Sequence, residues 1–169
     1  MQSEKMQSGQ QAGIIAPMSL TLSEKLSQIT QRLLARDPLP PLVPASVYDP
    51  TLTPAIDALD APALVTIGLH VLNDDLESAH PLSQELEGDP VADYWHAIIH
   101  RREGDYGNAR YWFGRVGSLP VLTEIYGSDP AAPGAFVARC RTAGRRDDAE
   151  LQEFQRTELA GLLDYAQHV

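Results

Sequence analysis

The sequence predicts an all-α fold, a compact domain of antiparallel helical hairpins without a β-sheet. Three observations support this prediction. Apolar residues recur at the three- and four-residue spacing of amphipathic helices along most of the chain after residue 20. Aspartate followed by proline, or a cluster of Asn, Asp and Gly, separates one such stretch from the next. No stretch shows the alternation of apolar and polar residues that is typical of a half-buried strand.

The composition indicates a single domain. The chain has 169 residues, of which 43% are hydrophobic, enough for one buried core. We assign the domain to residues 20–169 and interpret residues 1–19, rich in Gln and Ser, as a disordered tail. No stretch has the roughly 20 apolar residues that would cross a membrane. Because the lone Cys140 excludes an internal disulfide, we expect a cytoplasmic protein.

The N-terminal part of the domain predicts one helix and a connector. Hydroxyl side chains near residues 19–23 can cap the first turn, and apolar residues then recur until Leu33. Asp37 and Pro38 end this helix, because the residue before proline avoids the α conformation. Residues 38–59 are rich in proline and predict a connector that runs extended across the surface. A short turn is expected near its end.

Two helical hairpins are predicted over residues 61–116. In the first, Asp60 is the expected N-cap and residues 73–75 form the turn, while Pro81 should kink or shorten the second helix. In the second hairpin, Asp89 and Pro90 begin a helix and residues 104–108 make the turn. Three more helices are expected after Pro120. The residues predicted to be largely buried are Trp95, Ile98, Trp112, Phe113, Leu159 and Leu162.

The segment YWHAIIHRREGDYGNARYWF, from Tyr94 to Phe113, carries two resemblances. Its aromatic first helix, Gly-Asp-Tyr turn and following Asn-Ala resemble a tetratricopeptide hairpin. A repeat array needs three or more units, so this resemblance implies local packing only. The segment is also similar to a family of small uncharacterised helical proteins of bacteria and fungi. That similarity implies a helical fold over about residues 60–166 and implies no activity.

The histidines are the strongest candidates for a functional site. His96 and His100 lie one turn apart on a predicted helix, and Glu103 follows on the same face. Two imidazoles and a carboxylate at this spacing suit zinc or another divalent metal. His70 and His80, on the preceding hairpin, could complete the ligand set, as facing helices do in bundle-core metal sites.

The same residues have two other interpretations, and the sequence leaves all three open. Histidines next to Trp and Tyr often pack as structural residues in helix interfaces, and Glu103 can pair with a neighbouring arginine. The third interpretation is a metal-free acid–base or anion pocket, with Arg101, Arg102 and Arg110 as the candidate anion ligands. Most of the arginines lie between residues 95 and 146, although the whole chain has a net charge of −10.

Two functional hypotheses follow from these patterns. The first, which the sequence favours, is a non-catalytic interaction or scaffold protein with a protein partner and no cofactor. The second is a metal- or small-anion-binding protein, including a metal-dependent enzyme, that uses the histidines and Glu103. Nucleic acid is a poor partner for a chain with 23 acidic and 13 basic residues. Neither a phosphate-binding glycine loop nor a Gly-x-Ser-x-Gly nucleophile motif is present in the sequence.

Overall fold

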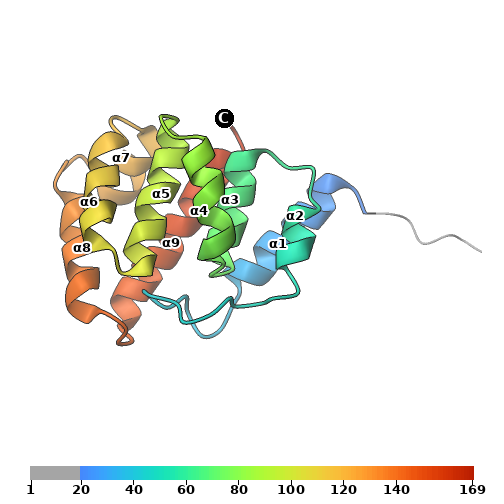
Figure 1. Ribbon diagram of the computed structural model, residues 1–169, viewed down its shortest axis with the longest axis horizontal. Helices are drawn as coiled ribbons and strands as arrows, with labels where there is room; N and C mark the ends of the chain where they lie inside the picture. The colour runs from blue at the N-terminus through green and yellow to red at the C-terminus, as the bar shows by residue number, and fades with distance from the viewer. Residues whose placement is uncertain (1–19) are drawn as a thin grey trace, which may run out of the picture.

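The regular structure of the chain is helical throughout the part that the computed structural model describes, residues 20–169 (Figure 1). The predicted all-α class is confirmed for these residues, and the predicted tail at residues 1–19 lies outside them. No helix within the described range is long and apolar enough to cross a membrane. The helices are α1 (Leu22–Leu34), α2 (Thr53–Asp57), α3 (Ala63–Leu72), α4 (Leu76–Glu85), α5 (Pro90–Glu103), α6 (Tyr106–Arg115), α7 (Pro120–Tyr126), α8 (Ala132–Ala143) and α9 (Ala149–Ala166).

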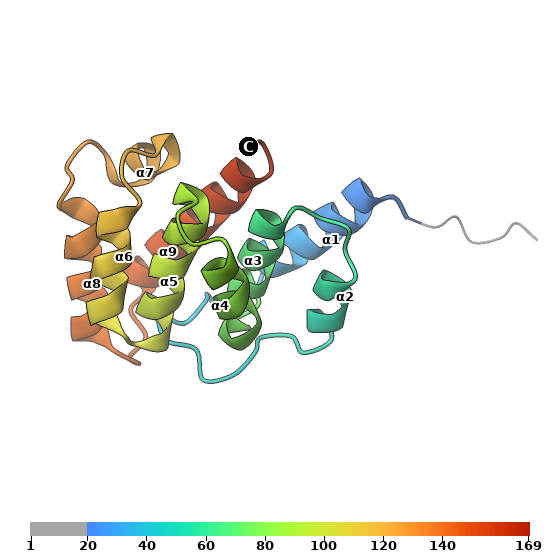
Figure 2. The ribbon, with the colours of Figure 1, turned by 45° about the horizontal axis from the view of Figure 1, so that its top comes forward.

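The consecutive helices α3 to α6 pack as neighbours, and α9 returns to lie against α3 and α7. Figures 1 and 2 place α1 and α2 at one end of the molecule and α6 and α8 at the other. The compact helical arrangement is as predicted, whereas a relationship to tetratricopeptide repeats stays a prediction.

Aspartate side chains begin several of these helices by accepting hydrogen bonds from free backbone N–H groups. Asp89 accepts from the N–H groups of Val91 and Ala92, which confirms the predicted start of α5. The predicted N-cap Asp60 is wrong. The chain enters α3 through Pro62, which has an extended ψ and no capping side chain, so the helix begins later than expected. Pro81 does not end α4, which continues to Glu85.

The turn between α3 and α4 is short, with three residues between the two helices. Asn73 ends α3 and Asp75 caps α4 by accepting from the N–H of Ser78, so Asp74 alone separates the two cap residues. Asp74 has a φ of 59°, a left-handed conformation that aspartate tolerates better than most residues do. Ion pairs with Arg36 and Arg102 hold its buried carboxylate in place.

The proline-rich segment connects α1 to α3 and also buries several side chains against the core, which the sequence did not predict. Leu42 and Val43 are buried. The carbonyl of Pro41 accepts hydrogen bonds from Gln155 of α9, at 3.0 Å, and from Arg102 of α5, at 3.2 Å. Extended backbone has no internal partner for its carbonyls, so these groups are free to satisfy buried side-chain donors.

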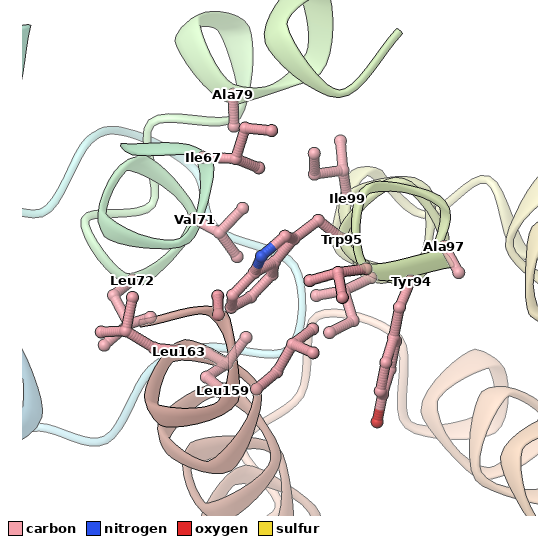
Figure 3. Packing of buried hydrophobic residues seen from close by; sticks show 14 of the residues in the cluster. Ile67, Val71, Leu72, Ala79, Tyr94, Trp95, Ala97, Ile99, Leu159 and Leu163 are labelled. Atoms are coloured by element: carbon pink, nitrogen blue, oxygen red, sulfur yellow. The ribbon is translucent and has the colours of Figure 1, made fainter. Parts of the chain in front are cut away.

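Trp95 of α5 lies at the centre of the main core with no solvent exposure. Figure 3 shows its indole ring pointing from α5 toward Val71 of α3 and toward Leu159 and Leu163 of α9. All six residues predicted to be buried are buried: Trp95, Ile98, Trp112, Phe113, Leu159 and Leu162.

Gly68 makes this close packing of α3 possible. A Cβ atom at Gly68 would lie 2.6 Å from Cζ2 of Trp95 and 2.9 Å from Cδ1 of Leu163. We therefore expect Gly68→Ala to lower the free energy of unfolding by about 1–3 kcal/mol, because the added methyl group forces the indole or α3 to shift. Urea denaturation measures this effect.

Gly114→Ala in α6 is the matched control, since nothing lies within 4 Å of a Cβ added there. This variant should gain about 0.5–1 kcal/mol, the ordinary advantage of alanine over glycine in a helix. Equal effects of the two substitutions would contradict the close contact at Gly68.

Candidate metal-binding site

Three histidines converge where α4 packs against α5. His80 comes from α4, and His96 and His100 come from α5, one helical turn apart. One nitrogen from each ring lies within 4.8 Å of those of the other two. The shortest separation, 3.0 Å, joins the Nε2 atoms of His80 and His96. The spacing of His96 and His100 follows from helix geometry, whereas tertiary packing adds His80.

Glu103 lies next to the Nδ1 atoms of two of the rings and accepts a hydrogen bond from one of them. Nδ1 of His80 donates to Oε1 of Glu103 over 2.8 Å, and Nδ1 of His100 lies 3.3 Å from Oε2. Partial burial works to raise the pKa of Glu103, but the neighbouring His100 and His80 rings outweigh it and lower the pKa below its usual value. Glu103 is therefore a carboxylate that orients the histidines, as in the carboxylate–histidine pairs of known metal sites.

His96 is the most buried of the three rings. It is only 2% exposed, and its ring stacks on Trp112 of α6 with a centroid distance of 4.0 Å. Burial, together with the nearby His100 and His80 rings, lowers the pKa of His96 to about 4. The ring is therefore neutral at pH 7, and a neutral imidazole is the form that binds a metal ion.

The cluster leaves ring nitrogens without hydrogen-bond partners. Since Nδ1 of His80 donates to Glu103, a neutral His80 accepts at Nε2 from Nε2–H of His96. Nδ1 of His96 then carries no proton, and it is buried without a partner. An unsatisfied buried polar group costs about 1–3 kcal/mol, and a metal ion bound at the Nε2 atoms would leave Nδ1 of His96 without a partner as well.

The structure does not bring His70 into the cluster, contrary to the sequence-based expectation. His70 is fully buried on α3, where its Nε2 lies 3.1 Å from Oδ1 of Asp57 in α2. Its Nδ1 lies 3.5 Å from Oδ2 of Asp75. Both ring nitrogens lie near carboxylates, one in α2 and one at the start of α4, so His70 links α3 to these neighbouring segments.

Arg101 does not form an anion site, because its guanidinium is already paired. Its Nη1 and Nη2 atoms donate to Oε1 and Oε2 of Glu158 over 3.1 and 2.5 Å, and both side chains are fully buried. The hydroxyl groups of Tyr94 and Tyr126 also donate to Oε1 of this carboxylate. The predicted anion role of Arg101 is therefore corrected to that of a buried counterion.

Arg102 is buried in a second ion pair, and Arg110 lies apart from both. Arg102 donates to Asp74 over 2.5 Å and to the carbonyl of Val71 over 2.6 Å. Arg110 is exposed on α6 and lines a hollow of about 900 Å³ that is bounded by α6, α7 and α8. The three arginines predicted as anion ligands thus do not share a site.

Sequence reasoning missed Trp112 as the stacking partner of His96 and Glu158 as the counterion of Arg101. Glu158 had a signal in the sequence, because a charged residue stands there among the apolar inner-face residues of the last helix. A charge at such a position points to a buried partner. Trp112 had no comparable signal, since its spacing is that of an ordinary core residue.

The chain shows no significant match to protein-family models, curated proteins or solved structures. The similarity to a family of bacterial and fungal proteins therefore stays a prediction. The geometry of the histidine cluster is the basis on which a function can be proposed.

Proposed function

We propose that the protein binds a divalent transition metal, with zinc as the reference ion, through His80, His96 and His100. The observation that carries this proposal is the mutual distance of their ring nitrogens, all within 4.8 Å. Imidazole nitrogens bind zinc at about 2.0–2.1 Å, which in a tetrahedral site separates two of them by roughly 3.3 Å. The Nε2 atoms of His80 and His96, 3.0 Å apart, already approach this separation.

The surroundings of the cluster also support a cation. Glu103 holds Nδ1 of His80 and lies close to Nδ1 of His100, so the Nε2 atoms of both rings are the ones left for a metal. A metal bound to these nitrogens would replace the close imidazole contact by coordination. The net charge of −10 favours a cation over an anion in the field of the whole protein.

Zinc titration of protein purified without a histidine tag tests the proposal. Calorimetry is expected to show one zinc ion per chain, and zinc at 100 times its dissociation constant should add about 2.7 kcal/mol to the free energy of unfolding. His80→Ala removes the most exposed of the three rings and should weaken zinc binding by more than the roughly 10–100-fold loss typical of an orienting residue.

His168→Ala is the matched control, because His168 is exposed and its ring nitrogen Nδ1 donates to the backbone carbonyl of Asp164, away from the cluster. This variant should bind zinc as the wild type does. Equal zinc affinity of wild type and His80→Ala, or a wild type that binds no zinc, would overturn the proposal. The hypothesis of a non-catalytic interaction protein would then be favoured.

A further inference from the structure

We infer that the bound metal keeps one coordination position open to solution, where it takes a small anion as an additional ligand. The inference rests on the proposed function, since it requires a metal held by His80, His96 and His100. Zinc sites with four protein ligands are structural, whereas sites with three protein ligands and an open position bind exchangeable ligands and are the catalytic type. The number of side chains that can reach the metal therefore decides whether a coordination position stays open.

The two carboxylates nearest the cluster are engaged elsewhere. Oε1 of Glu103 accepts from Nδ1 of His80 over 2.8 Å, and Oε2 lies 3.3 Å from Nδ1 of His100. Asp105 accepts from the backbone N–H of Asn108 over 3.1 Å and from its side-chain amide over 2.7 Å, as the N-cap of α6. Oδ2 of Asp105 lies 3.9 Å from Nδ1 of His100, so both carboxylates lie near Nδ1 atoms and not near the Nε2 atoms of these rings.

One side of the cluster is buried and the other is partly exposed to solvent, so a ligand can enter from the exposed side. His96 is 2% exposed and lies under Trp112, which closes the site on the α6 side. The side chain of His80 is 22% exposed, and that of Glu103 is 33% exposed. A ligand from solution therefore reaches the metal past His80, at the surface between α4 and α5.

Of the two carboxylates near the cluster, Glu103 is the one that could close the site, because it contacts both His80 and His100. If its carboxylate released His80 and His100 and bound the metal, the site would have four protein ligands and no open position. Glu103→Gln separates the two arrangements. Glutamine retains an oxygen that accepts from Nδ1 of His80 but is a much poorer metal ligand than a carboxylate, because it carries no charge.

Cobalt(II) titrated into the full chain reports the coordination directly, because its visible absorption changes when a ligand is added. In the wild type we expect a Co²⁺ spectrum that shifts saturably with sodium azide and stays unchanged with sodium perchlorate, a very weakly coordinating salt, at the same ionic strength. Glu103→Gln should bind Co²⁺ about 10–100-fold more weakly, as expected for loss of an orienting carboxylate, and should show the same azide response.

The outcomes separate this inference from the proposed function. A wild-type Co²⁺ spectrum that is insensitive to azide overturns the open position while metal binding stands. If Glu103→Gln then responds to azide, Glu103 is the fourth ligand. A wild type that binds no Co²⁺ and no zinc overturns both proposals together. His80→Ala should lack the Co²⁺ spectrum, which assigns the absorption to the histidine cluster.

Discussion

Replacing Glu158 by alanine is expected to lower the free energy of unfolding by about 3–5 kcal/mol. The side chains of Glu158 and Arg101 are both fully buried, and two hydrogen bonds of 3.1 and 2.5 Å join them. Although burial disfavours the charged guanidinium, Glu158 outweighs it and raises the pKa of Arg101 above its ordinary value. Without Glu158, Arg101 would keep its charge in the core with no counterion.

The tyrosines around Glu158 add to the expected loss. The hydroxyl of Tyr126 donates to Oε1 over 2.6 Å, and that of Tyr94 donates over 3.2 Å. Burial and the negative charge of Glu158 raise the pKa of both hydroxyl groups, so they stay protonated and need an acceptor. Glu158→Ala therefore leaves one buried charge and two buried donors unsatisfied.

Urea denaturation of Glu158→Ala measures this loss, and Glu153→Ala is the matched control. Glu153 stands five residues earlier on α9 and pairs with Arg156 at the surface, where removal of an ion pair changes stability little. The double variant Arg101→Met/Glu158→Leu should recover only part of the loss. Apolar residues of similar volume replace the buried ion pair, but the hydroxyl groups of Tyr94 and Tyr126 still lack their acceptor. A loss below about 1 kcal/mol in Glu158→Ala would show that water reaches Arg101.

Trp95→Ala is expected to cost about 3–5 kcal/mol of the free energy of unfolding, through loss of buried apolar area and the cavity left behind. Trp95 is fully buried, and its indole ring packs between α3 and α9, against Gly68 and Leu163 (Figure 3). Residues of α3, α5 and α9 surround this space. The cavity cannot collapse without moving them, so the upper part of the range is expected.

The measurement is again urea denaturation, with far-ultraviolet circular dichroism to follow the helices. Tyr111→Ala on α6 removes an aromatic ring that is 56% exposed and should change stability by no more than about 0.5 kcal/mol. Trp95→Phe should lose less than Trp95→Ala, because the phenyl ring fills much of the same space. A Trp95→Ala loss as small as that of Tyr111→Ala would contradict the central position of Trp95.

The sequence by itself determined the helical class, most helix starts and the buried aromatic residues. Periodic apolar spacing and capping by residues such as Asp89 act within one or two turns, so these features can be predicted from neighbouring residues alone. The same locality explains why His96, His100 and Glu103 were predicted to share a face of one helix. Asp60 was misassigned because Pro62, two residues further along the chain, is the residue from which α3 begins.

Only the tertiary structure decided which distant residues complete these local patterns. It brought His80 to His96 and placed His70 next to Asp57, although His70 and His80 lie on the two helices of one hairpin. It also paired Arg101 with Glu158, which is 57 residues away. The physical reason is that a helix fixes which of its own side chains share a face, whereas the packing of α3, α4, α5 and α9 fixes which faces meet.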